Sequence, residues 1–245
     1  MNSPQGAIRR MHRFLSAFSS IGCIIFALLG VANVQAAVNA AATRVVFNDG
    51  ETEASLQLVN KNTYPVVVQA WSDDGDPQAT PDKSASPVLV LPAVFKLQPE
   101  EMTNLRLMVM DNPLPKDRES MFWLNIYEIP PRLAGDSVQK ITIALRTQMK
   151  LFLRPKGLGK PEKSIGQKIT FMRQNESLTI ENPTEFYLSL IGVTINNIPL
   201  DIGTLPPKSH HQITLPSGLE NTSKKISFSL INDEGNYWDY NQIIN

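Results

Sequence analysis

Residues 141–155, which read ITIALRTQMKLFLRP, alternate apolar and polar side chains over an unusual length. Six apolar side chains occupy odd positions, and a lysine and two arginines lie among the even ones. Because successive side chains of a strand point to opposite faces, the pattern predicts a long β-strand with one apolar and one basic face. From the residues alone, the apolar face is interpreted as core of the domain that contains it.

Shorter alternating runs recur from residue 44 onward. About seven precede residue 156 and five follow it, with turn signals such as NDG at residues 48–50 between them, and no stretch has a convincing helical period. This spacing predicts an all-β chain of two immunoglobulin-like β-sandwiches. The polar stretch that begins KGLGKP after residue 155 is interpreted as a linker, which gives domains of residues 37–156 and 157–245.

The first 36 residues are predicted to be a signal peptide. Arg9, Arg10 and Arg13 precede an apolar stretch, and small residues ending at Ala36 or Ala40 offer two cleavage positions. The alternative is an N-terminal membrane anchor, because the apolar stretch is long enough to span a thin bilayer. The small-residue ending favours cleavage and therefore export.

Composition gives no support for a nucleic-acid partner, because the chain has 23 basic and 23 acidic residues. Loss of residues 1–36 would remove three basic residues and no acidic one, leaving 20 against 23 and a net charge near −3. The single cysteine, Cys23, lies in the same segment. The exported chain is therefore expected to have neither a disulfide nor a cysteine metal site.

Signals for enzymatic or metal chemistry are weak. His210 and His211 are adjacent on an expected strand and point to opposite faces, so they are interpreted as surface residues. The acidic stretch at residues 73–76 lacks the later glutamate of a calcium loop and is interpreted as a turn. The chain has no nucleophile-elbow, zinc-protease or phosphate-loop motif, so neither an enzyme nor a cofactor or metal is expected.

The most specific motif is LPKDRESMFWLNIYEIP, residues 114–130. Taken alone, its three charges at residues 117–119 would form a solvated cap before a core strand. Its order of apolar, Pro, Asp, basic, Glu, Ser, aromatic and Asn positions resembles the signature of the periplasmic pilus-assembly chaperones of the chaperone–usher pathway. The resemblance extends over the rest of the chain through TRVVF, SPVLVLPAVFKLQP, KLFLRP, NPTEFYLSL, LPPKS and INDEGN, with Ala93 in place of a common proline.

The resemblance implies two immunoglobulin-like domains set at an angle, with a cleft between them. It implies a non-enzymatic periplasmic chaperone that completes pilus subunits by donor-strand complementation and delivers them to an outer-membrane usher. Pilus subunits and the usher are the implied partners, and weak self-association of the free chaperone is a further implication. No cofactor is implied.

The resemblance also assigns residues that bind the subunit. Arg44 and Lys150 match a basic pair in the cleft that holds the C-terminal carboxylate of the subunit, a task suited to charge-assisted hydrogen bonds. Ile141, Ile143 and Leu145 match the alternating side chains that are donated to the subunit. For these three residues, the resemblance replaces the interpretation as core.

Two other groups of residues are assigned to the chaperone itself. Leu151 and Leu153 are expected to remain in the core of the first domain. Glu119, Arg154 and Asp233 match a charged network between the domains, which holds their angle rather than contacting the subunit. The alternative is that these three charges are unrelated surface residues.

The segment RLAGDSVQK at residues 132–140 is short and resembles the short-loop branch of the family. The alternative function is an exported immunoglobulin-like binding module, such as a pilus subunit or an adhesin-like protein. A subunit would need only one domain with a missing strand, plus an N-terminal donor extension. The two complete sets of expected strands favour the chaperone.

Overall fold

The computed structural model describes residues 37–76, 78, 80–110, 114–131, 144–217, 219 and 225–245. Within these ranges the chain consists of strands, loops and two 3-10 helices, η1 (Pro81–Lys83) and η2 (Lys163–Lys168). No helix in the described part is long and apolar enough to cross a membrane. The predicted signal peptide and the predicted donor residues Ile141 and Ile143 lie outside the described residues.

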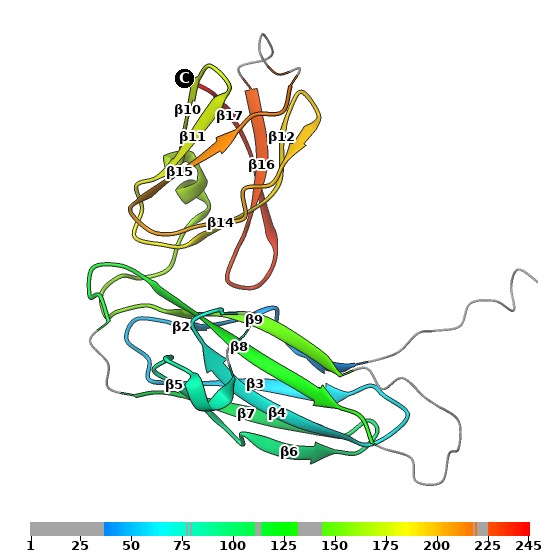
Figure 1. The fold of residues 1–245 in the computed structure, drawn as a ribbon. Helices are drawn as coiled ribbons and strands as arrows, with labels where there is room; N and C mark the ends of the chain where they lie inside the picture. Colours follow the sequence, from blue (N-terminus) through cyan, green and yellow to red (C-terminus); the bar gives the residue numbers. More distant parts are fainter. Residues whose placement is uncertain are drawn as a thin grey trace, which may run out of the picture. The chain divides into compact units, whose positions relative to one another are not determined.

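The first nine strands form a sandwich of two sheets (Figure 1). One sheet has the strand order β1-β3-β7-β5, and the other has the order β2-β9-β8-β4-β6. All pairs are antiparallel except β2 and β9, which run parallel. The strands are β1 (Val38–Ala40), β2 (Arg44–Phe47), β3 (Glu53–Asn60), β4 (Val66–Asp73), β5 (Val88–Leu91), β6 (Val94–Leu97), β7 (Met102–Val109), β8 (Ser120–Ile129) and β9 (Leu145–Leu153).

The remaining strands form a second sandwich (Figure 1). One sheet has the order β10-β11-β15, and the other has β13-β12-β16-β17 with β14 also paired to β12. The strands are β10 (Thr170–Gln174), β11 (Ser177–Asn182), β12 (Leu188–Ile195), β13 (Ile198–Leu200), β14 (Thr204–Leu205), β15 (Ser209–Thr214), β16 (Lys225–Ile231) and β17 (Tyr237–Ile243). The predicted all-β fold with two immunoglobulin-like sandwiches is therefore confirmed.

Alternation of side chains builds a separate apolar core in each sandwich. In β3, Leu56 and Leu58 are buried, whereas Ser55 and Gln57 face solvent. In the second sandwich, the inward positions of β16 are likewise apolar and buried. Because one face of each sheet is apolar, a shift of one residue in register would expose the whole set, so the pattern fixes the pairing.

Some strands differ from the sequence-based expectation. The apolar run at residues 87–101 is divided into β5 and β6, which pair in opposite sheets, so the chain crosses between sheets near Pro92. Strands β1 and β17 were not expected. β1 has only three residues, and Tyr240 is the only fully buried side chain of β17, so neither carries a strong alternating signal.

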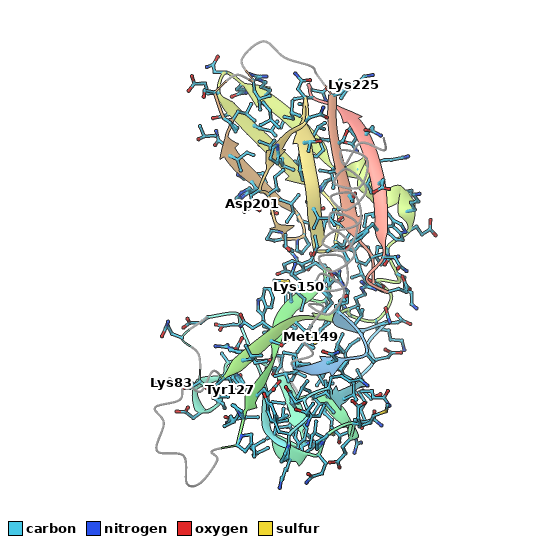
Figure 2. All side chains as sticks on the ribbon, turned by 90° about the vertical axis from the view of Figure 1, so that its right-hand side faces the viewer. Lys83, Tyr127, Met149, Lys150, Asp201 and Lys225 are labelled. Atoms are coloured by element: carbon cyan, nitrogen blue, oxygen red, sulfur yellow. The ribbon has the colours of Figure 1, made fainter. Side chains whose placement is uncertain are left out.

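Strand β9 carries the described part of the apolar face that the sequence predicts for residues 141–155. Met149, Leu151 and Leu153 are buried in the core of the first sandwich, so the expectation for the last two is confirmed. Leu145 has the same parity but is 43% exposed, so the apolar face extends beyond the core at the start of the strand. Figure 2 labels Met149 and Lys150 next to each other on this strand.

β9 begins with an exposed residue and continues into the core, which predicts different losses of stability for two leucine-to-alanine substitutions on the same face. Leu151→Ala removes a side chain that is 0% exposed and should lower the free energy of unfolding by about 2–5 kcal/mol. Leu145→Ala, on the same face of the same strand, should change it by less than about 0.5 kcal/mol because its side chain is already solvated. Urea denaturation followed by tryptophan fluorescence measures both, and equal losses would contradict the division.

Candidate subunit-binding site

Arg44 and Lys150 lie side by side on neighbouring strands. Parallel pairing of β2 with β9 places the Cα of Arg44 opposite the Cα of Lys150. Residues paired in this way project their side chains from the same face of the sheet. The structure therefore brings together the two cations that the sequence analysis paired, although they are far apart in the chain.

Arg44 is buried and only partly satisfied. It is 9% exposed, and its NH1 donates to the backbone carbonyl of Ile231 at 3.1 Å. Its Nε is buried and has no hydrogen-bond partner in the described part of the chain. Burial lowers the pKa of Arg44, while the charges of Asp233 and Glu119 act in the opposite direction. An unpaired guanidinium N–H in such a position is costly, so it favours an external acceptor.

Lys150 is held by hydroxyl groups rather than by an acid. Its Nζ donates to Ser189 Oγ at 2.9 Å and to Thr204 Oγ1, and it lies 5.8 Å from the ring centroid of Trp123. Burial and the neighbouring charge of Arg44 lower the pKa of Lys150 to about 8. Among the described residues, neither Lys150 nor Arg44 forms an ion pair.

A strand edge begins beside these two cations. β8 pairs with β9 over its whole length, from Leu145 to Leu153, but β2 pairs only with residues 150–153. Residues 145–149 therefore have no strand partner on that side within the described part of the chain. Unpaired backbone donors and acceptors at an edge can pair with an added strand.

Arg154 connects acids from both sandwiches. Its Nε donates to Glu119 Oε1 at 2.7 Å, and its NH1 and NH2 donate to the two carboxylate oxygens of Asp233 at 2.6 and 2.7 Å. Glu119 Oε2 also accepts a hydrogen bond from the backbone N–H of Tyr187 at 2.7 Å. Glu119 precedes β8 and Asp233 lies between β16 and β17, so the three charges are brought together across the two sandwiches.

Burial and ion pairing act in opposite directions on the pKa values of this network. The pKa of Glu119 is raised by its burial, against the opposing effect of Arg154 and the hydrogen bond from Tyr187. Burial would lower the pKa of Arg154, but hydrogen bonds and charge from Asp233 and Glu119 outweigh it, and the net pKa is raised. The three residues are an ion-pair cluster in which Glu119 and Arg154 are buried and Asp233 is partly exposed, rather than isolated surface charges.

Sequence reasoning missed a second buried cluster, on β4, β8 and β9. Asp73 is fully buried, and its Oδ2 accepts hydrogen bonds from Trp71 Nε1, Asn125 Nδ2 and Arg146 NH2 at 2.7–3.1 Å. Its Oδ1 accepts from the backbone of Gly75 at 2.9 Å, which forms the turn expected for this acidic stretch. The cluster joins the start of β9 to two further strands.

Two other positions can be compared with expectation. His210 and His211 are exposed on β15, as expected for surface residues. Asp117 pairs with Arg118 and also with Lys208 of the second sandwich, at 2.9 and 2.8 Å. Hydrogen bonds from these two cations lower the pKa of Asp117. The pairs are solvent-exposed, so their contribution to stability is small.

Family models match the sequence of each sandwich. Residues 37–159 match the pili and flagellar-assembly chaperones, PapD N-terminal domain, and residues 165–242 match the pili assembly chaperone PapD, C-terminal domain. This chain is therefore a member of the pilus-assembly chaperone family.

Individual relatives agree with the family match. The "Probable fimbrial chaperone LpfB" of Escherichia coli O157:H7 is 36% identical over 81% of this chain and 84% of its own. The crystal structure of the Pseudomonas aeruginosa CupB2 chaperone covers 84% of this chain and 100% of its own, with 32% identity and a TM-score of 0.72. The SafB chaperone of Salmonella enterica, solved in complex with the SafA pilin, matches 87% of this chain and 99% of its own, with 26% identity and a TM-score of 0.75.

The buried network predicts a large effect of removing its central cation. Arg154→Met leaves Glu119 buried without a charged partner and should lower the free energy of unfolding by about 3–5 kcal/mol. The matched control is Arg106→Met, which breaks a pair with Glu53 at 2.6 Å on the surface and should cost about 0–1 kcal/mol. Urea denaturation at pH 7 compares the two, and a loss for Arg154→Met no larger than the control would contradict the assignment.

Proposed function

We propose that this chaperone holds the C-terminal carboxylate of a pilus subunit between Arg44 and Lys150. The observation that carries the proposal is the side-by-side register of two cations, one buried and one partly buried, that have no acid partner among the described residues. A carboxylate has two acceptor oxygens, so it can accept a hydrogen bond from the free Nε–H of Arg44 and another from the Lys150 ammonium. Each bond of this kind contributes about 1.5–3 kcal/mol.

Anchoring at this point determines the direction of the bound chain. The edge available beside the anchor runs from residue 149 back to Leu145, because β2 covers β9 from Lys150 onward. A subunit whose last residue lies at Lys150 must therefore approach from the Leu145 end and run in the same direction as β9. The subunit strand would add in parallel, with backbone hydrogen bonds along residues 145–149.

Ile141, Ile143 and Leu145 would then supply the missing side chains of the subunit. Exposure of Leu145 in the free chaperone supports this role, since its apolar surface is available to a partner. Burial of each large aliphatic side chain contributes about 1.5–3 kcal/mol, more than an exposed ion pair. The aliphatic side chains would provide affinity, and the carboxylate anchor would fix the register of the strand.

The remaining parts of the proposal concern the cellular role. Residues 1–36 act as a signal peptide, and the exported chain works in the periplasm as domains of residues 37–156 and 157–245; the family match beginning at residue 37 supports this division. The Glu119–Arg154–Asp233 network holds the two domains in place. The chaperone belongs to the short-loop branch, has no enzymatic activity and delivers subunits to an outer-membrane usher.

Capture of a subunit tests the anchor directly. A candidate subunit from the host is co-expressed in the periplasm with wild type, Arg44→Ala or Lys150→Ala, and the affinity of each purified pair is measured. Loss of one charge-assisted hydrogen bond of about 1.5–3 kcal/mol should weaken binding roughly tenfold to a hundredfold. Lys208→Ala, which removes an exposed cation elsewhere, is the control and should bind like wild type. Equal affinity in all four folded proteins would contradict the anchor.

The lowered pKa of Lys150 predicts a pH dependence of the same binding. The subunit carboxylate is ionised throughout the neutral range, so it binds the protonated lysine and raises its pKa in the complex. Because the free lysine has a pKa of about 8, affinity should be constant below that pH and fall above it, by up to about tenfold per pH unit. Lys150→Arg keeps its charge and should flatten the profile between pH 7 and 9.5. A flat wild-type profile would contradict the prediction.

A further inference from the structure

Glu128 is a buried acid that the subunit-binding site does not use. Its side chain, 5% exposed, lies near the end of β8. Its Oε2 accepts a hydrogen bond from the backbone N–H of Val38 at 2.8 Å, and its Oε1 accepts one from Asn62 Nδ2 at 2.7 Å. In the described part of the chain no cation pairs with it. The nearby Lys61 pairs with Glu100. A buried carboxylate without a cation is costly.

A second acceptor beside Glu128 is also unsatisfied. Asn62 is 2% exposed, and both hydrogens of its Nδ2 are used, one by Glu128 and one by Asn60 Oδ1 at 2.9 Å. Its Oδ1 is buried and receives no hydrogen bond from the residues that the structure describes. A group with a positive charge and more than one N–H donor would match the carboxylate and the amide oxygen together.

Ala37 adjoins, through its neighbours in the chain, the residues that carry both acceptors. The backbone N–H of Lys61 donates to the carbonyl of Ala37 at 3.2 Å, which holds Ala37 beside the residue preceding Asn62. The nitrogen of Ala37 is three covalent bonds before the nitrogen of Val38, which already touches Glu128. Adjacent backbone nitrogens are at most about 3.6 Å apart, so the Ala37 nitrogen lies no more than about 6–7 Å from Glu128 Oε2, within reach of a pairing once the amine is free.

We propose that Glu128 and Asn62 form a binding site for the α-ammonium group of Ala37. The proposal rests on the export and leader cleavage proposed above. Hydrolysis of the Ala36–Ala37 peptide bond adds one water, leaving a carboxylate on the released leader and an α-amine that takes up a proton. The new ammonium group has three N–H donors and one positive charge, which match the two acceptors.

The proposed site predicts which of the two possible cleavage positions is used. Cleavage after Ala40 would remove all of β1 and leave Glu128 without the Val38 N–H as well as without a cation. Cleavage after Ala36 keeps β1 paired with β3 and completes the site. β1 and β8 belong to opposite sheets, so the ion pair would link the two sheets of the first sandwich. Glu128 is paired in register with Leu145, the first residue of β9.

Two measurements on the protein purified from the periplasm test the proposal. Sequencing of its N-terminus should give Ala37; a start at Ala41, or retention of the leader, would overturn it. Acetylation by an activated ester at pH 7 then reports on the α-amine, because only the deprotonated amine reacts. Pairing that raises the pKa of this group by one unit would slow its acetylation about tenfold.

Matched variants identify the partner of the amine. Glu128→Gln should speed acetylation of Ala37 about tenfold relative to wild type, as followed by mass spectrometry of the N-terminal peptide. Glu53→Gln removes an exposed carboxylate from the first sandwich and should leave the rate unchanged. Equal rates in wild type and Glu128→Gln would overturn the proposal. If Glu128→Gln does not fold, the acetylation rate of folded wild type is compared with the rate of wild type unfolded in urea, where the amine should react about tenfold faster.

Subunit capture by the same preparations separates this proposal from the proposed function. Glu128 and Asn62 do not belong to the carboxylate anchor, so folded Glu128→Gln should still capture the subunit. Failure of wild type to capture any subunit would contradict the proposed function without affecting the N-terminal site. An acetylation rate that does not depend on Glu128, with capture intact, would overturn only the N-terminal site.

Discussion

The parallel pairing of β2 with the last four residues of β9 is the contact on which the rest of the site depends. It places Arg44 opposite Lys150, and because β2 covers β9 only from that point onward, it also determines where the free edge begins. Every other strand pair in this sandwich is antiparallel. A longer β2 would cover residues 145–149 and leave no edge for an added strand. The anchor and the edge therefore arise from a single strand pairing.

The charged side chains that lie away from solvent fall into two groups. Arg154 is paired with Glu119 and Asp233, so its opposite charges are supplied within the chain. Arg44 and Glu128 are also buried and Lys150 is partly buried, but the described residues supply none of them with an opposite charge in contact. Buried charges without an opposite charge in contact favour the binding of a group of opposite charge. For the two cations we propose the carboxylate of a subunit, and for Glu128 the amine released by processing of the chain.

Sequence patterns predicted the architecture well because alternation is a local signal. Strands such as β3, whose buried and exposed side chains alternate, were expected at the correct positions. The edge strand β17 was missed because its inward positions carry few fully buried side chains. The grouping of Arg44 with Lys150 came from resemblance to a family, because nothing in the local sequence indicates which strands run parallel. The pairing of Glu128 with Val38 joins residues 90 positions apart and left no signal that one sequence could reveal.

The central claim is that a terminal carboxylate, rather than apolar contact alone, sets the register of the bound subunit. The most direct measurement compares two synthetic peptides that carry the last strand of a candidate subunit, one ending in a free carboxylate and the other in an amide. Isothermal titration calorimetry at pH 7 should show at least tenfold tighter binding of the acid peptide to wild type. The double variant Arg44→Ala/Lys150→Ala should bind the two peptides equally. Equal affinity of the acid and the amide for wild type would contradict the account.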